Sequence, residues 1–185
     1  MPKTLKEKLY ETQLNNFKQQ SRHFLLTSRF NNQTWQENQI FRKKHPKLGC
    51  IYCAPDPISQ AIPSEAVMFI LEMNNDTNRI MGIGMVRNRP IFNKYYVYEN
   101  DNYNRYVYAG KTRIDRSEMT EEEDRIMQVF DILCFNGNRH MKRGQGIKSF
   151  PADMLFRCSK RLDLVQFIST MFKGRLAKTN QNKVD

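Results

Sequence analysis

The fold is decided by one stretch of the sequence, Ala66-Val-Met-Phe-Ile-Leu-Glu-Met73, Asn74-Asn-Asp-Thr-Asn78 and Arg79-Ile-Met-Gly-Ile-Gly-Met-Val-Arg87. The first segment is apolar at nearly every position, which is typical of a strand buried on both faces. The second has the composition of a turn, so the third returns as a partner strand. Gly82 and Gly84 predict a bulge or a close backbone approach there. The stretch therefore predicts a buried antiparallel hairpin.

Further strand segments surround this hairpin. Gly49–Tyr52 is short and apolar, and the aromatic segments Tyr95–Tyr98 and Arg105–Ala109 flank an Asn-rich turn at Glu99–Asn104. Aromatic and β-branched residues favour strands. We therefore expect four or five antiparallel strands, the last of which extends through Lys111–Ile114.

Helical patterns occupy both ends of the chain. Residues 4–20 begin with the capping box Thr4–Glu7, and a second capping box, Thr120–Glu123, starts another helix. A last helix begins near Pro151 and carries an apolar stripe that continues to Phe172. The order of elements is therefore helix, strands and two helices.

This order predicts an α+β fold in which an antiparallel sheet, partly closed into a barrel, is flanked by N-terminal and C-terminal helices. The 185 residues correspond to about one domain. We expect residues 1–47 to form a basic helix and arm, residues 48–172 to form the α+β domain, and residues 173–185 to form a basic flexible tail.

Composition excludes three broad classes of protein. The hydrophobic fraction of 39% is too high for a disordered chain. No apolar run approaches the roughly 20 residues of a membrane span, and the N-terminus has no apolar signal segment. We therefore expect no transmembrane segment, and a location in the cytoplasm, the nucleus or a virion rather than secretion.

Charge is distributed unevenly over a chain whose net charge is +11. Residues 1–50 hold ten basic and three acidic side chains, residues 51–135 hold nine and thirteen, and residues 136–185 hold eleven and three. Two basic ends around a near-neutral to acidic centre favour a polyanionic partner, above all nucleic acid. An acidic protein or an anionic membrane surface would also satisfy this pattern, and so would a basic surface that only keeps the protein soluble.

Two clusters of basic residues are candidates for phosphate contacts. Around the glycines Gly144 and Gly146, backbone amides and cations together could meet phosphates. A plain solvated loop is the alternative reading. The candidate phosphate-binding residues are Arg139, Lys142, Arg143 and Lys148 in this loop, and Arg42, Lys43 and Lys44 in the first basic region.

Tyrosines interleaved with basic residues form another candidate surface. Six tyrosines lie within residues 95–108, with Lys94, Arg105 and Lys111 close by. Such a surface can stack bases and pair phosphates, and Tyr106 and Tyr108 are the candidates for stacking. The alternative is that these tyrosines pack within the sheet, because strands are rich in tyrosine.

Four cysteines are present, and Cys50-Ile-Tyr-Cys53 has the spacing of half a zinc site. Cys134 and Cys158 are not paired in that way, and they lie on apolar helix faces where a thiol packs as a small hydrophobe. We therefore expect packing thiols and no metal, with zinc at Cys50 and Cys53 as the alternative.

The hairpin at Glu65–Asn88 resembles the central hairpin of the PUA-like superfamily, which includes the EVE, ASCH and YTH branches. The resemblance covers roughly residues 48–115 and implies a small barrel with a pocket that binds RNA or modified bases. By position, it implies the pocket residues Trp35, Tyr52, Asn74, Asn75 and Arg87. High Asn, Lys, Ile and Tyr usage also resembles that of uncharacterised small basic proteins of giant double-stranded DNA viruses.

These observations favour a non-enzymatic nucleic-acid-binding module without a cofactor, which reads RNA or modified bases in a pocket. The alternative is a viral structural protein, a minor capsid or core component, which docks through its basic termini on acidic partners or packaged genome. An enzyme is a third reading. Esterase, P-loop and zinc-protease motifs are absent. Arg143–Lys148 resembles the acyl-coenzyme-A loop of the GNAT acetyltransferases, but Lys148 stands where that loop has a small residue.

Overall fold

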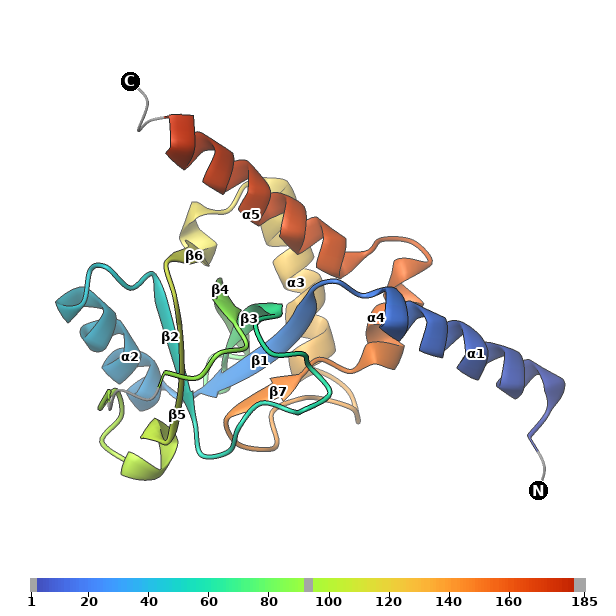
Figure 1. The fold of residues 1–185 in the computed structure, drawn as a ribbon, viewed down its shortest axis with the longest axis horizontal. Helices are drawn as coiled ribbons and strands as arrows, with labels where there is room; N and C mark the ends of the chain where they lie inside the picture. Colours follow the sequence, from blue (N-terminus) through green and yellow to red (C-terminus); the bar gives the residue numbers. More distant parts are fainter. Residues whose placement is uncertain (1–2, 92–94, 182–185) are drawn as a thin grey trace.

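Five helices and seven strands make up the computed structural model, which describes residues 3–91 and 95–181 (Figure 1). In chain order, the elements are α1 (Leu5–Gln20), β1 (Phe24–Phe30), α2 (Asn32–Lys44), β2 (Cys50–Ala54), β3 (Val67–Asn74), β4 (Arg79–Arg87), the 3-10 helix η1 (Asp101–Asn104), β5 (Tyr106–Gly110), β6 (Thr112–Asp115), the 3-10 helix η2 (Arg116–Glu118), α3 (Glu121–Phe135), β7 (Ile147–Ser149), α4 (Ala152–Ser159) and α5 (Leu164–Gln181). This is the α+β class that the sequence predicts.

The predicted hairpin is confirmed as β3 and β4, which pair antiparallel at the centre of the sheet. Successive side chains of β3 enter two different cores. Phe69, Leu71 and Met73 pack in one core, and Met68 and Ile70 pack in the other. Because strand side chains alternate between faces, a strand covered on both faces needs apolar residues at nearly every position.

The prediction of an antiparallel, partly closed barrel is wrong. The main sheet is open and mixed, with the strand order β6-β4-β3-β1-β7. Strand β1 pairs parallel with β3, so that Leu25 lies opposite Phe69. A parallel pair needs a long crossover connection, and here the chain from β1 to β3 makes it through α2 and β2. The sequence pattern of residues 24–30 did not predict a strand, and the parallel pairing of this segment was therefore not expected.

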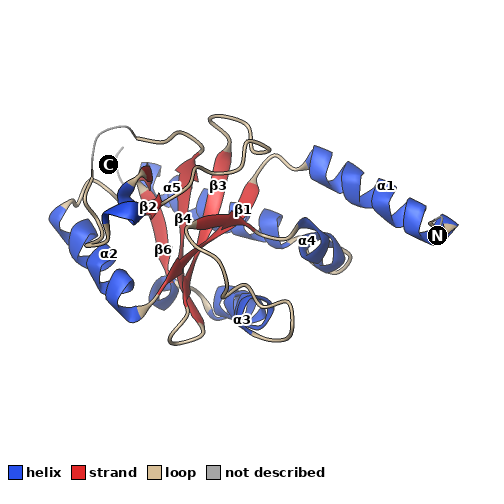
Figure 2. Ribbon diagram, turned by 90° about the horizontal axis from the view of Figure 1, so that it is seen from below, coloured by secondary structure: helices blue, strands red, loops and turns tan. Residues whose placement is uncertain are grey.

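Two layers cover the two faces of this sheet (Figure 2). Helices α3, α4 and α5 pack on one face and bury the first core. A two-stranded antiparallel sheet, β2 with β5, packs with α2 on the other face. Both β1 and α2, which precede residue 48, therefore contribute to the packed body of the protein.

Helix termini follow the predicted capping boxes. Thr4 with Glu7 and Thr120 with Glu123 each satisfy backbone amides at a helix start. Helix α1 buries none of its residues and projects away from the rest of the chain (Figures 1 and 2). Its contacts lie on α4, where the ring of Phe156 packs edge-on against Tyr10.

Three segments differ from their predicted secondary structure. Residues 95–98 form a loop, because Asn104 Oδ1 accepts hydrogen bonds from the amides of Val97 and Tyr98. The predicted last helix is two helices, since Asp163 Oδ1 caps the start of α5. Helix α5 also continues through most of the predicted tail, whereas residues 182–185 and Lys94 lie outside the described residues.

Candidate nucleic-acid interface

The basic loop, residues 136–148, runs from the end of α3 into β7 and carries four of the predicted phosphate contacts. Side chains from the sheet hold its backbone. Arg29 Nε donates to the carbonyl of Met141 at 2.6 Å, and Asn75 Nδ2 donates to the carbonyl of Lys142 at 3.2 Å. The amide of Met141 also donates to the carbonyl of Cys134 at 2.7 Å. The loop is therefore fixed through its main chain, which leaves its long side chains available to other partners.

The charges of the loop are largely uncompensated. Arg139 forms an ion pair with Asp153, with 3.1 Å between Nη1 and Oδ2. The side chains of Arg143 and Lys148 are exposed, and neither has a hydrogen bond or an ion pair within residues 3–91 and 95–181. Positive side chains without acidic neighbours create a local positive potential. This surface suits a polyanion.

A cavity of about 220 Å³ lies against the basic loop and is lined by Gly144–Gly146, Arg29, Asn75, Tyr98 and Tyr103. Gly144 and Gly146 have φ values of 102° and 66°, which side chains other than glycine rarely adopt. The volume is below the roughly 300–1,000 Å³ of pockets for drug-sized ligands. It is therefore a compartment for one small chemical group rather than for a large molecule.

Two polar atoms in the residues of this cavity lack partners. Arg29 Nη1 and Asn75 Oδ1 are buried, and neither has a hydrogen-bond partner among the residues that the structure describes. The orientation of the Asn75 amide follows from its bond to the Lys142 carbonyl, which requires the nitrogen on that side. Burial lowers the pKa of Arg29. A buried polar group without a partner costs about 1–3 kcal/mol, so one donor and one acceptor remain unused here.

From Tyr98, which lines this cavity, a chain of polar contacts leads into the second core. The hydroxyl of Tyr98 accepts a hydrogen bond from Asn38 Nδ2 at 3.1 Å, and Asn38 Oδ1 accepts one from Arg42 Nε at 2.9 Å. The guanidinium groups of Arg42 and Arg113 each lie 5.6 Å from the ring centroid of Trp35. Cation–π contacts of this kind fix both arginines against the indole.

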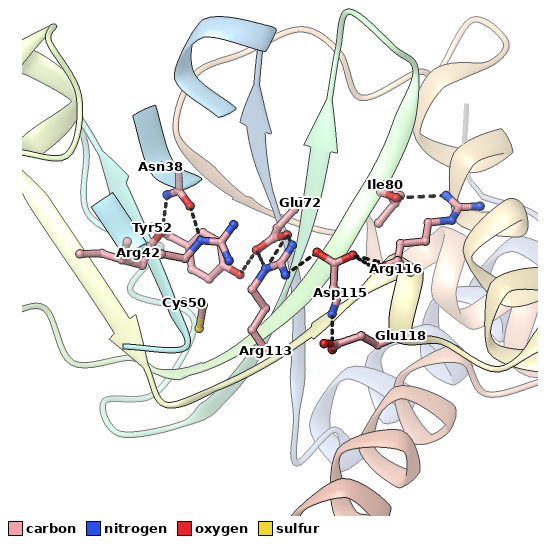
Figure 3. A network of polar contacts seen from close by, with 12 residues as sticks. Asn38, Arg42, Cys50, Tyr52, Glu72, Ile80, Arg113, Asp115, Arg116 and Glu118 are labelled. Carbon is pink, nitrogen blue, oxygen red and sulfur yellow. Dashed lines mark hydrogen bonds and ion pairs between the residues drawn. The ribbon is translucent and has the colours of Figure 1, made fainter. Parts of the chain in front are cut away.

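At the centre of the network lies Glu72, whose side chain is fully buried. Glu72 accepts hydrogen bonds from Tyr52 Oη at 2.7 Å and from Arg113 Nε and Nη2 at 2.9 and 2.6 Å (Figure 3). Burial opposes the charge of Arg113, but the Glu72 carboxylate outweighs it and raises the Arg113 pKa. Burial, followed by the Glu72 charge, raises the Tyr52 pKa. Both oxygens of Glu72 are thus occupied within the protein.

The predicted close approach at the glycines of β4 is confirmed at this network. A Cβ atom on Gly84 would lie 2.0 Å from Tyr52 Oη, and one on Gly82 would lie 2.7 Å from Arg113 Nη2. Distances under 3.0 Å are closer than real Cβ contacts. Both glycines therefore make room for the side chains that surround Glu72.

Of the residues predicted for a base pocket or for base stacking, Asn75 lines the cavity at the basic loop. Trp35 and Tyr52 are buried in the second core, as is Tyr108, whose hydroxyl accepts from the amide of Ile58. Asn74 is also buried, and its Oδ1 accepts a bond from the Asp76 amide in the turn after β3. Tyr106 lies half-buried on β5.

The remaining predicted phosphate contacts lie elsewhere, and so does Arg87 of the predicted pocket. Arg42, Lys43 and Lys44 form the last turn of α2, where Arg42 is held by Asn38. Arg87 ends β4 and donates to the carbonyl of Glu65 at 3.0 Å. None of these residues lines the cavity at the basic loop. The four cations of the basic loop do not line the cavity either, although Arg143 directly precedes Gly144, which does.

Arg29 and Tyr98 are two of the cavity residues that were not predicted from the sequence. Arg29 stands in Phe24-Leu-Leu-Thr-Ser-Arg-Phe30, and a single cation in an otherwise uncharged strand segment signals a charge held near the core. Tyr98 belonged to the tyrosine cluster, but nothing in that cluster distinguished it from its neighbours.

The cysteines are all free, and Cys50, Cys53 and Cys134 are buried. Cys50 and Cys53 are three residues apart on β2, so their side chains point to opposite faces of the strand and do not converge on one ion. In the described part of the chain, no group of three or more His, Cys, Asp or Glu side chains is arranged to hold a metal.

Comparison with known proteins gives no match, whether to a family model, to a curated protein or to a solved structure. The resemblance to the PUA-like superfamily therefore stays a prediction. Among residues 3–91 and 95–181, no helix has both the length and the apolar character of a membrane span.

Proposed function

We propose that the protein is a nucleic-acid-binding module that contacts its ligand through the basic loop. One observation carries this proposal: exposed cations without acidic partners flank a cavity whose residues retain an unused donor and an unused acceptor. Arg143 and Lys148 would contact backbone phosphates, and Lys142 would add to the positive potential. Phosphate contacts supply most of the sequence-independent affinity for nucleic acid.

The cavity would receive one base. A base edge presents an acceptor next to a donor, which would complement Arg29 Nη1 and Asn75 Oδ1 respectively once the cavity opens enough to expose these two buried atoms. A phosphate or a carboxylate fits less well, because an ionised anion offers no proton to Asn75 Oδ1. The rings of Tyr98 and Tyr103 line the same cavity, and their centroids are 6.4 Å apart. Recognition of single-stranded RNA and of modified bases fits this arrangement, because an unpaired base can enter a pocket.

Fluorescence anisotropy with labelled single-stranded RNA, single-stranded DNA and duplex DNA tests the proposal. We expect the logarithm of the affinity to fall linearly with the logarithm of salt concentration, and single strands to bind more tightly than duplex. Binding that vanishes at physiological salt for all three ligands would contradict the proposal.

A second candidate function is that of a virion structural component, and the projecting helix α1 favours it. Leu5 and Leu9 are 85% and 58% exposed on a helix that buries none of its residues. The helix carries Lys6, Lys8 and Lys18 against Glu7 and Glu11, a small excess of positive charge, so an acidic protein surface is the partner that fits it. Limited proteolysis tests this function: cleavage of α1 in the free protein, and its protection in a purified assembly, would support it. Equal cleavage in both would contradict it.

A further inference from the structure

A second cavity, of about 640 Å³, lies where the end of α1, the start of β1 and the turn between α4 and α5 meet. Helix α1 reaches α4 at this end of the molecule (Figure 1). The volume falls within the roughly 300–1,000 Å³ of small-molecule sites. No residue lines both this cavity and the one at the basic loop. We call it the α1–α5 groove.

Apolar side chains form much of the α1–α5 groove. Leu25, Ile62, Phe150 and Leu155 line it, and all four are buried in the two cores. Phe17 lines it from the last turns of α1. These side chains are held by packing with the rest of the protein. Phe24 and Val165 are half-buried and line the groove as well, so together with Phe17 they offer a preformed apolar surface to a ligand.

Cationic side chains surround this apolar surface. Lys18 on α1, Arg22 before β1 and Lys173 on α5 line the groove and are exposed. None of the three has an ion pair with an acidic side chain in the described part of the chain. The one acid of the groove, Asp163, already accepts two backbone hydrogen bonds of 3.0 Å at the start of α5. The positive charge of the groove is therefore not neutralised from within.

His23 lies among these charges, and its pKa responds to them. It lines the groove, and its ring is 5.6 Å from that of Phe69. Burial lowers the pKa of His23, and the positive charges of Lys173 and Arg22 lower it further. These like charges therefore act on the same site from two segments of the chain. A bound anion would relieve their repulsion and would raise the pKa of His23.

We propose that the α1–α5 groove binds a small amphipathic anion, with a phosphate or carboxylate head between Arg22, His23 and Lys173 and an apolar body on Leu25, Phe150 and the residues beside them. Cations without partners select the charge of the ligand, and the apolar surface selects its body. A nucleic-acid strand would use the cations but not the apolar surface. The site is thus separate from the proposed interface at the basic loop.

Isothermal titration calorimetry with octyl phosphate below its micelle concentration tests the proposal, with octanoate, inorganic phosphate and 1-octanol as separate arms. We expect octyl phosphate or octanoate to bind at least tenfold more tightly than inorganic phosphate and 1-octanol. The double variant Arg22→Gln/Lys173→Gln would weaken that binding at least tenfold. Lys178→Gln, which removes an exposed cation from the same helix outside the groove, would change it less than twofold.

The histidine signals in an NMR titration provide a second readout. Bound octyl phosphate would raise the pKa of His23. It would leave the NMR signals of His45 and His140, which lie outside the groove, unchanged. The proposal is overturned if both octyl ligands bind no more tightly than inorganic phosphate, if the double variant binds like the wild type, or if the pKa of His23 does not move on binding. None of these results would test nucleic-acid binding, which is proposed for the basic loop, a different surface.

Discussion

The hydroxyl of Tyr52 donates a 2.7 Å hydrogen bond to Oε1 of Glu72, and neither side chain is exposed to solvent. Tyr52 belongs to β2 and Glu72 to β3, so the bond joins the small sheet to the main sheet. The bidentate contact of Arg113 completes the shell of the carboxylate. A buried charge is tolerated when its partners are complete, and it is costly when one of them is lost.

Glu72→Gln removes the charge that holds Arg113 and leaves that guanidinium buried without its counter-ion. We expect the free energy of unfolding to fall by about 3–5 kcal/mol, which is typical when one partner of a buried pair is lost. Urea denaturation followed by the fluorescence of Trp35, the single tryptophan, measures it. The exposed Glu122→Gln is the control and should cost less than about 1 kcal/mol. Equal losses in both variants would contradict the role of Glu72.

Gly84→Ala places a methyl group 2.0 Å from Tyr52 Oη, so the side chains of the network must move. We expect a loss of about 1–3 kcal/mol or more, as for other overpacked cores. Gly174→Ala on α5 is a matched control, because its added Cβ meets nothing within 4 Å. That change should be neutral or stabilise by up to about 1 kcal/mol. Urea denaturation of both variants measures the difference, and a Gly84→Ala protein as stable as Gly174→Ala would refute the close packing.

His23 makes stability depend on pH. Its pKa in the folded protein is lowered by burial and then by Lys173 and Arg22, so the unfolded chain binds the proton more readily. The stability contributed by neutral His23 is complete above the unfolded pKa of about 6.5 and is lost as pH falls through that value toward the folded pKa. Denaturation of the wild type and of His23→Gln between pH 8 and pH 5 should give curves that diverge on the acid side, the variant losing less stability. Parallel curves would exclude this role.

The cysteines should differ in reactivity. Burial, followed by the charge of Glu72, raises the pKa of Cys50 to about 12, and burial with the charge of Asp131 raises that of Cys134 to about 12. Cys53 is buried as well, whereas Cys158 is half-buried. Because the thiolate is the reactive form, an aromatic disulfide reagent at pH 8 should label Cys158 first and the other three only after denaturation. Rapid labelling of Cys50 in the native protein would show that β2 opens.

Local sequence patterns predicted the elements whose partners lie nearby in the chain. The apolar run of β3 predicted burial on both faces, and Gly84 predicted close approach, because both follow from the strand's own residues. Strand β1 was missed, since Thr27 and Ser28 make it look polar although both are buried. Its parallel pairing with β3 depends on contacts between Leu25 and residues some forty positions away, which periodicity does not reveal.

The candidate interface was predicted only where its residues are close together in the sequence. Composition alone identifies the basic loop, because its cations are close in the sequence. The contacts that fix it join Arg29 to Met141 and Asn75 to Lys142, across 112 and 67 positions. Aromatic residue type, by contrast, did not distinguish a stacking surface from a core residue, and Trp35 is the example, being 8% exposed.

The salt dependence of single-stranded RNA binding to the double variant Arg143→Gln/Lys148→Gln tests the central claim most directly. Each lost phosphate contact lowers the slope of log affinity against log salt by about 0.7 for single strands. We therefore predict a slope reduced by about 1.4, with weaker binding to every sequence. The control variant Lys8→Gln/Lys178→Gln removes the same charge from exposed positions on α1 and α5 and should leave the slope unchanged. An unchanged slope in the loop variant, or equal reductions in both variants, would contradict the assignment of the interface to the basic loop.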